Sequence, residues 1–252
     1  MPRLFSLFAL LLFGFLQAQP PAGAEPGPPR FSLGLGLLVN DNAYAGQDSE
    51  VIPIPLLTYR SGRFTFQGIR ASYALVQSRK QTFEFALQPR FESYEEDDSE
   101  VLRGMEDREK SLDLGLAYQR NFGRNSLNFE AMFDVLDRSG GYELDLSLQR
   151  RHRAGMWILS GDLSLGYRDK NNTDYYYGVT LPEALPTRPF YQPDAAVIPA
   201  VGVQVIRPLG RSGWQWLSIF NTSFLPSTIE DSPIVDKSRL STFLTGFSYR
   251  FK

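Results

Sequence analysis

The sequence predicts an all-β protein, a transmembrane antiparallel β-barrel of about twelve strands. Three observations support this prediction. Segments of about ten residues alternate apolar and polar side chains, as strands with two different faces do. The connections between them alternate between tight turns and long loops, which is typical of outer-membrane barrels. Aromatic residues gather toward the ends of the segments, where a girdle at the membrane interface would lie.

The N-terminal region is predicted to be an export segment followed by a linker. Arg3 precedes an apolar run over 4–16, which is too short to span a bilayer as a helix. An uncleaved anchor is the alternative, but small residues offer two cleavage sites, Leu16-Gln17-Ala18 and Ala22-Gly23-Ala24. The expected parts are a signal peptide over 1–24, a proline-rich tail over 25–30 and a barrel domain over 31–252.

Composition excludes several classes of function. The 252 residues carry a formal net charge of −2, so nothing indicates a nucleic-acid partner. The chain contains no cysteine, which excludes disulfides, thiolate metal sites and cysteine nucleophiles. Aromatic residues make up 13% of the chain, a high share for a soluble domain. This composition suits a protein that turns an alternating apolar face toward lipid.

The clearest alternation covers four consecutive segments in the middle of the chain. In the first, 111–121, Leu114 and Leu116 lie on one face and Asp113 on the other. The three segments that follow and obey the same rule are 126–136, 141–152 and 156–168. A soluble sandwich would turn the apolar face inward, whereas a transmembrane barrel turns it toward lipid and its polar face toward the lumen.

The remaining segments set the strand count. They are 31–39, 51–60, 82–94, 195–207, 214–225 and 239–251. The stretch 63–77 is decisive, because a closed single-chain bacterial barrel needs an even number of strands. Split near Gly68, it gives twelve strands, with a short hairpin partner for the segment before it; ten strands plus an inserted segment is the alternative. Pro53 and Pro55 cannot donate to a ladder, so their strand is expected to be irregular.

Connection lengths orient the predicted barrel. The tight connections are 123–125, 153–155 and 210–213, and the long ones are 95–110, 169–194 and 226–238. If the last strand ends in the periplasm, the tight turns are periplasmic and the long loops lie outside the cell. Only the short connection 137–141 departs from this pattern, because it falls on the outer side.

The last strand is expected to close the barrel. Aromatic residues occupy one face of 243–251, and such a face would promote aggregation in water. We therefore expect lipid to cover it and the strand to pair with the first one. Phe247, Tyr249 and Phe251 resemble the C-terminal signal that the barrel assembly machinery reads, although Lys252 follows the final aromatic.

Five motifs, in order, resemble one known family. They lie at Ile54–Gly68, Gly104–Leu116, Tyr175–Thr180, Arg188–Ala195 and Asp231–Ser238, and read IPLLTYRSGRFTFQG, GMEDREKSLDLGL, YYYGVT, RPFYQPDA and DSPIVDKS. With a final YRF, they resemble the MltA-interacting protein / OmpV family over most of the mature chain. The resemblance implies an outer-membrane barrel. Members are described as scaffolds that join a murein hydrolase to a murein synthase, and as adhesive or transport-like proteins.

The family-like motifs fall mostly in the predicted outer loops and supply the candidate interaction residues. These are Tyr177, Gly178, Arg188, Tyr191, Ser232 and Pro233. One interpretation is that they form an extracellular surface or a lid over the lumen. The other is that the tyrosine, glycine and proline residues fix the shape of the loops.

Catalytic and metal-binding patterns do not stand out. His152, the only histidine, lies beside a tight turn on the predicted periplasmic side, and no G-x-S-x-G motif is present. The acidic loop 95–110 lacks the glycine-containing calcium-loop pattern, so we expect a solvated charge run rather than a cation site. We therefore expect no enzyme activity, no cofactor and no metal.

The predicted lumen carries more acidic than basic side chains. They are Glu84, Arg90, Glu92, Asp113, Glu130, Asp134, Glu143, Asp145, Asp162, Arg168 and Arg250. Paired, these groups would fill a closed structural or interaction barrel; solvated, they would line a narrow channel for small polar or cationic solutes. We expect the interaction barrel, with the channel as the alternative. Its expected partners are outer-membrane lipid, lipopolysaccharide, the barrel assembly machinery and periplasmic murein enzymes.

Overall fold

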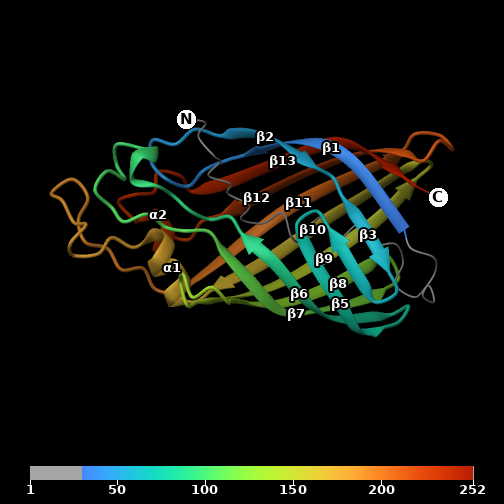
Figure 1. Cartoon of the computed structure of the whole chain (residues 1–252), viewed down its shortest axis with the longest axis horizontal. Coiled ribbons are helices and arrows are strands. Elements are labelled where there is room, and N and C mark those ends of the chain that lie inside the picture. Colours follow the sequence, from blue (N-terminus) through green and yellow to red (C-terminus); the bar gives the residue numbers. More distant parts are fainter. Residues whose placement is uncertain (1–29, 252) are drawn as a thin grey trace.

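The computed structural model describes residues 30–251 as one closed antiparallel β-barrel with strands β1 to β13 (Figure 1). The predicted signal peptide, nearly all of the proline-rich tail and Lys252 lie outside these residues. Within 30–251, no helix is long and apolar enough to cross a membrane. The prediction of an all-β barrel is therefore confirmed.

The first half of the barrel contains several short strands between two longer ones, β1 and β6. They are β1 (Arg30–Asn40), β2 (Glu50–Pro55), β3 (Thr58–Ser61), β4 (Phe64–Gln67), β5 (Arg70–Gln77) and β6 (Gln81–Arg90). Both β2 and β3 pair with β1, one after the other, so together they fill one position in the wall. The thirteen strands of the sheet therefore occupy twelve positions (13 − 1 = 12), as predicted.

The second half is regular. Its strands are β7 (Ser111–Phe122), β8 (Asn125–Asp134), β9 (Tyr142–Ala154), β10 (Trp157–Arg168), β11 (Ala196–Pro208), β12 (Trp214–Phe224) and β13 (Arg239–Arg250). Three short helices, η1 (Glu96–Asp98), α1 (Lys170–Tyr177) and α2 (Ser227–Glu230), lie in long loops. Those loops share one end of the barrel, which we call the loop end; the other end, the turn end, carries the tight connections 62–63, 78–80, 123–124, 155–156 and 209–213 (Figure 1).

Strand β13 closes the barrel against β1, as the sequence predicted. The register runs from Ser32↔Arg250 to Asn40↔Thr242. The two backbones approach closely along this pairing, because a Cβ on Gly34 would overlap the carbonyl oxygen of Phe247. Glycine therefore permits the close contact between the first and last strands.

The irregular region between β2 and β6 follows the prediction in outline. The stretch 63–77 splits at Gly68, whose φ of 61° suits a tight turn, and gives β4 and β5. The proline-containing strand is interrupted at 56–57, as expected for a strand that lacks donors. The predicted segment 82–94 is too long, because β6 ends at Arg90 and the following residues enter the loop end.

Side chains alternate between lipid and lumen as predicted. Leu114 and Leu146 are exposed on the outer wall, whereas Asp113, adjacent to Leu114 in sequence, is 2% exposed and faces the interior. Outward rows such as Leu165–Leu146–Phe129 continue across hydrogen-bonded neighbours. Together these rows form the apolar band that lipid would cover.

The lumen has one apolar wall, which differs from the polar lumen that was expected. A cluster of buried luminal side chains joins β1, the β2 region, β12 and β13, and we call it the luminal apolar cluster: Leu38, Ile52, Leu56, Ile219 and Leu244. Polar and charged side chains occupy the opposite wall, on β5 to β10. The alternation rule gives only the direction of a side chain, so it did not separate the two walls.

Leu146→Arg should destabilise the barrel by about 2–4 kcal/mol if it lies near the membrane midplane, because it places a cation against lipid. Ser147→Arg, at the next residue but on the luminal face, should cost much less. Urea unfolding of the protein refolded in lipid vesicles measures both free energies. Equal losses in the two variants would contradict the assignment of the faces.

Candidate functional site

Four loops fold together over the loop end of the barrel. The segments 41–49, 91–110, 169–195 and 225–238 form what we call the loop cap, which shares a core of buried hydrophobic residues. Four tyrosines lie at its centre with at most 1% of their surface exposed: Tyr44, Tyr94, Tyr176 and Tyr177. The loops at this end therefore share one packed core.

Helix α1 directs two of these tyrosines inward. The Asp169 carboxylate caps the helix by accepting hydrogen bonds from the backbone N–H groups of Asn171 and Asn172. The Tyr44 hydroxyl then donates to the Tyr176 carbonyl at 3.1 Å, and the Tyr44 ring meets Tyr94 edge-on at 4.7 Å. Burial raises the pKa of the Tyr44 hydroxyl well above its usual value, so it remains a neutral donor.

A buried ion pair joins two loops of the cap. Arg108 Nη2 lies 2.9 and 3.2 Å from the two carboxylate oxygens of Glu183, and Arg108 Nε donates to the Tyr175 carbonyl. Glu183 also accepts from the backbone N–H groups of Thr180 and Glu106. Burial opposes the charge on Glu183, but these donors outweigh it and lower its pKa.

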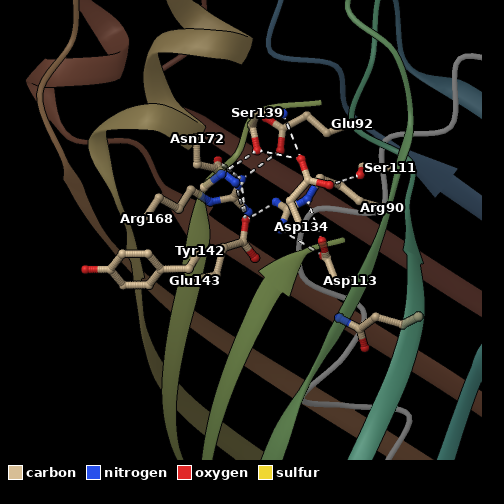
Figure 2. A network of polar contacts seen from close by, with 12 residues as sticks. Arg90, Glu92, Ser111, Asp113, Asp134, Ser139, Tyr142, Glu143, Arg168 and Asn172 are labelled. Carbon is tan, nitrogen blue, oxygen red and sulfur yellow. Dashed lines mark hydrogen bonds and ion pairs between the residues drawn. The ribbon is translucent and has the colours of Figure 1, made fainter. Parts of the chain in front are cut away.

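Beneath the cap, arginines and carboxylates form a continuous network that we call the arginine layer (Figure 2). Arg90 Nη2 lies 2.8 Å from Asp113 Oδ2, and Arg90 also bonds Glu143. Arg168 Nη1 lies 2.9 Å from Glu143 and 2.7 Å from Glu92, which belongs to the cap loop after β6. The network thus links the barrel wall to the cap.

A third arginine extends the charged wall deeper into the lumen. Arg70 Nη1 lies 2.7 Å from Glu130 Oε2, and Arg70 Nη2 lies 3.4 Å from Glu84 Oε1. Arg70, Arg90 and Arg168 therefore each pair with two carboxylates. Such pairing offsets the cost of holding charges away from water and fixes the side chains in place.

Other luminal polar groups lack partners. In the described part of the chain, both carboxylate oxygens of Asp162, the Ser160 hydroxyl and the Gln149 amide nitrogen form no hydrogen bond, although these residues are at most 5% exposed. They lie on β9 and β10, toward the turn end from the arginine layer. Buried polar groups normally find partners, so this part of the lumen is suited to water or a polar solute.

The six candidate interaction residues lie together in the cap. Tyr177, Gly178, Arg188 and Ser232 are buried, while Tyr191 and Pro233 are half-buried. The Ser232 hydroxyl donates to the Tyr177 carbonyl at 2.6 Å, and the Tyr191 hydroxyl donates to the Thr228 carbonyl at 2.9 Å. The Arg188 guanidinium donates to carbonyls of Val101, Arg103 and Glu183. These contacts are with the cap itself, and a role for the residues in binding stays a prediction.

The turn end has an electrostatic feature that sequence reasoning missed. Exposed basic side chains at or beside the turns form what we call the basic collar: Arg63, Arg79, Lys80, Arg124, Arg153 and Arg211. Segments around the turns contain no Asp or Glu; they are 58–67, 76–83, 118–128, 148–160 and 205–217. The repeated Arg or Lys beside each predicted turn was the available signal.

Two further predicted features are placed by the structure. His152 is exposed on β9 near the turn end. In the acidic loop, Glu95 to Asp98 are exposed, and no group of three or more His, Asp or Glu within 30–251 is arranged to hold a metal ion. Asp98 and Asp107 accept backbone hydrogen bonds within this loop, and the buried pair of Arg108 and Glu183, which no sequence pattern singled out, joins it to the next long loop.

Glu183→Gln should loosen the cap by about 3–5 kcal/mol, because it leaves Arg108 buried without its counter-ion. In the wild type the pKa of the Glu183 carboxyl is lowered, so the carboxylate stabilises the cap at neutral pH. This stabilisation is lost as the pH falls through the folded-state pKa. Limited proteolysis of the loops should therefore show rapid cleavage of the variant at pH 7, and a smaller pH dependence than in wild type.

The control for this prediction is Glu100→Gln. Glu100 pairs with Arg103 on the surface, where the Glu100 side chain is 89% exposed, so its removal should leave the cleavage rate unchanged. Equal protection of the Glu183→Gln variant and the wild type would show that the ion pair does not hold the cap.

Comparison with known proteins agrees with this architecture. The family model described as "MltA-interacting protein MipA" matches residues 33–251. Two proteins of Escherichia coli (strain K12) are similar: YiaT is 28% identical over 235 residues (92% of this chain, 95% of the relative), and the MltA-interacting protein is 26% identical over 245 residues (96% and 98%). The COG4313 outer membrane channel from Pseudomonas putida F1 has a TM-score of 0.45 at 12% identity, covering 93% of this chain and 100% of that one. The chain belongs to the MltA-interacting protein MipA family of outer-membrane barrels.

Proposed function

We propose that this outer-membrane barrel is an interaction protein whose turn end docks a periplasmic murein enzyme. The basic collar is the observation that carries the proposal. A relative that covers nearly the whole chain is named MltA-interacting protein, which supports the class of partner. Because outer-membrane barrels place their short turns in the periplasm, the collar would face that compartment.

The positive charge of the collar determines what kind of partner surface would bind it. Arg124, Arg153 and Arg211 lie at three different turns, so they present positive charge across the mouth of the barrel rather than at one point. No carboxylate in the surrounding segments neutralises them. An acidic face on the partner would be attracted and oriented by this ring, in a salt-dependent way.

The closed loop end supports an interaction role over an open pore. We infer that the tyrosine core of the cap and the arginine layer beneath it obstruct the entry of a solute from the loop end. An interaction barrel requires no such route. In this account the lumen mainly supports the wall and the cap.

Reversing three charges of the collar should weaken docking. We expect Arg124→Glu/Arg153→Glu/Arg211→Glu to raise the Kd for the purified MltA homologue of the host bacterium at least about tenfold at low salt, because complementary charge becomes repulsive. Surface plasmon resonance with the full barrel in nanodiscs measures this Kd. The wild-type affinity should also fall as salt is added.

The matched control reverses three exposed basic residues at the loop end. Arg103→Glu/Arg138→Glu/Lys170→Glu makes the same change in net charge, with side chains that are 70%, 44% and 50% exposed. This variant should bind like wild type. Equal weakening in both triple variants, or no wild-type binding, would reject docking at the turn end.

A narrow channel for small polar or cationic solutes is the second candidate. The observation in its favour is Asp162, whose buried carboxylate has no partner among residues 30–251, beside the unbonded Ser160 hydroxyl. An unpaired carboxylate in a narrow lumen attracts cations. This candidate requires the cap and the arginine layer to open.

The wild-type protein should remain closed in planar bilayers at neutral pH, because the cap and the arginine layer obstruct the loop end. Single-channel recording of the full barrel measures this. A steady cation-selective current, with lower selectivity in Asp162→Asn, would instead support the channel and contradict the closed barrel.

A further inference from the structure

Among residues 30–251, the barrel wall contains one seam without backbone pairing. Strand β2 pairs with β1 from Leu35↔Pro55 to Asn40↔Glu50, but no strand within 30–251 pairs with its other edge. On the far side of the seam, β6 pairs with β5 only as far as Leu87↔Ala71. Figure 1 shows β2 and the end of β6 apart, with the short β3, β4 and β5 completing the wall only nearer the turn end.

Three prolines lie along the seam, each at a position where another residue would point its N–H into the seam. Leu56 N–H donates to the Gly34 carbonyl on β1, so the N–H directions alternate and the nitrogens of Pro53 and Pro55 point away from β1, into the seam. Asn121 N–H donates to the carbonyl of Lys80, the residue before β6, so the even-numbered residues of β6 direct their backbone groups toward β7. The nitrogen of the odd-numbered Pro89 therefore points away from β7 and into the seam.

Proline at these positions reduces the free-energy cost of leaving a strand edge unpaired in hydrocarbon. Each unsatisfied N–H there costs several kcal/mol, and open edges are normally excluded from membranes. Proline has no N–H, so an edge that carries it loses part of this penalty. The sequence therefore fits a wall that is permanently unpaired here.

Register places the seam within the apolar band. Val51 on β2 aligns with Val39 on β1, which aligns with Phe243 on β13 and Phe220 on β12. Phe243, Phe220 and Val51 are 40%, 46% and 63% exposed and share the lipid-facing row. The seam thus opens on lipid in the half of the membrane nearer the loop end, which is the outer leaflet if the long loops are extracellular.

An apolar surface lies directly inside the seam. Ile52 and Leu56, on and just after β2, belong to the luminal apolar cluster, and Ile54 packs against it. At the other edge of the seam the luminal side chains of β6 are polar, namely Gln88 and Arg90, so the β2 edge is the one that offers an apolar chain a matching surface. The loop cap blocks approach from the aqueous side of the loop end.

We propose that the seam is a lateral portal through which the acyl chain of an outer-leaflet lipid reaches the luminal apolar cluster. The chain enters between β2 and the end of β6, where no hydrogen bond has to break, and the head group stays at the membrane surface. Its contacts with Ile52, Ile54 and Leu56 replace contacts with neighbouring lipid. This goes beyond docking at the turn end, and either can fail without the other.

Photolabelling from within the bilayer tests the portal. The full barrel is reconstituted in vesicles that contain phosphatidylcholine with a diazirine at the end of one acyl chain, and labelled residues are mapped by mass spectrometry. The head group keeps this probe in the leaflet, so it cannot enter through the aqueous turn end. We expect label on luminal Leu38 and Ile52 as well as on lipid-facing Leu37 and Val51.

Luminal residues behind paired strands provide the internal control. Ala117 on β7 and Met132 on β8 are buried in the lumen and should carry no label. Ile54→Trp, which places a larger side chain against the cluster, should reduce luminal labelling at least about fivefold, whereas Val51→Trp on the lipid face should not. Label confined to lipid-facing side chains, equal label at Met132, or luminal label unchanged in Ile54→Trp would overturn the proposal.

Discussion

The requirement that backbone polar groups be paired inside a membrane governs this structure. It explains why the first and last strands must meet, and why glycines such as Gly34 lie where β1 and β13 approach most closely. It also explains the position of prolines in the wall. Pro53, Pro55 and Pro89 lie where the pairing is absent, so the same constraint accounts for both the closed wall and its single seam.

The interior follows a second constraint, that a buried charge needs a partner. Arg70, Arg90 and Arg168 each meet two carboxylates, and Arg168 reaches Glu92 in the cap. This coupling means that the cap and the upper wall form one ordered unit. The turn end is different, since the sequence segments around its exposed arginines contain no Asp or Glu.

Strand number, faces and closure could be predicted from sequence because they depend on local alternation and on the parity of a closed barrel. The split at Gly68 is one such case. The cap could not, because Tyr44, Tyr94 and Tyr177 come from three loops that no periodicity relates. The seam could not be predicted either, because only the strand register shows that the backbone nitrogens of Pro53 and Pro89 point into it. Pro53 was recognised as a source of irregularity, but not as an edge.

Cysteine pairs offer the most direct test of a wall that is paired everywhere except at one seam, since the chain has no cysteine of its own. Pro53→Cys combined with Leu37→Cys should form a disulfide, because those residues are partners across β1 and β2, and neighbouring strands bring Cα atoms within about 5.5 Å. Pro53→Cys combined with a cysteine at Leu87, Pro89 or Phe91 should not. A seam pair that oxidises as fully as the Leu37 pair would show that β2 and β6 are adjacent, and would contradict the account.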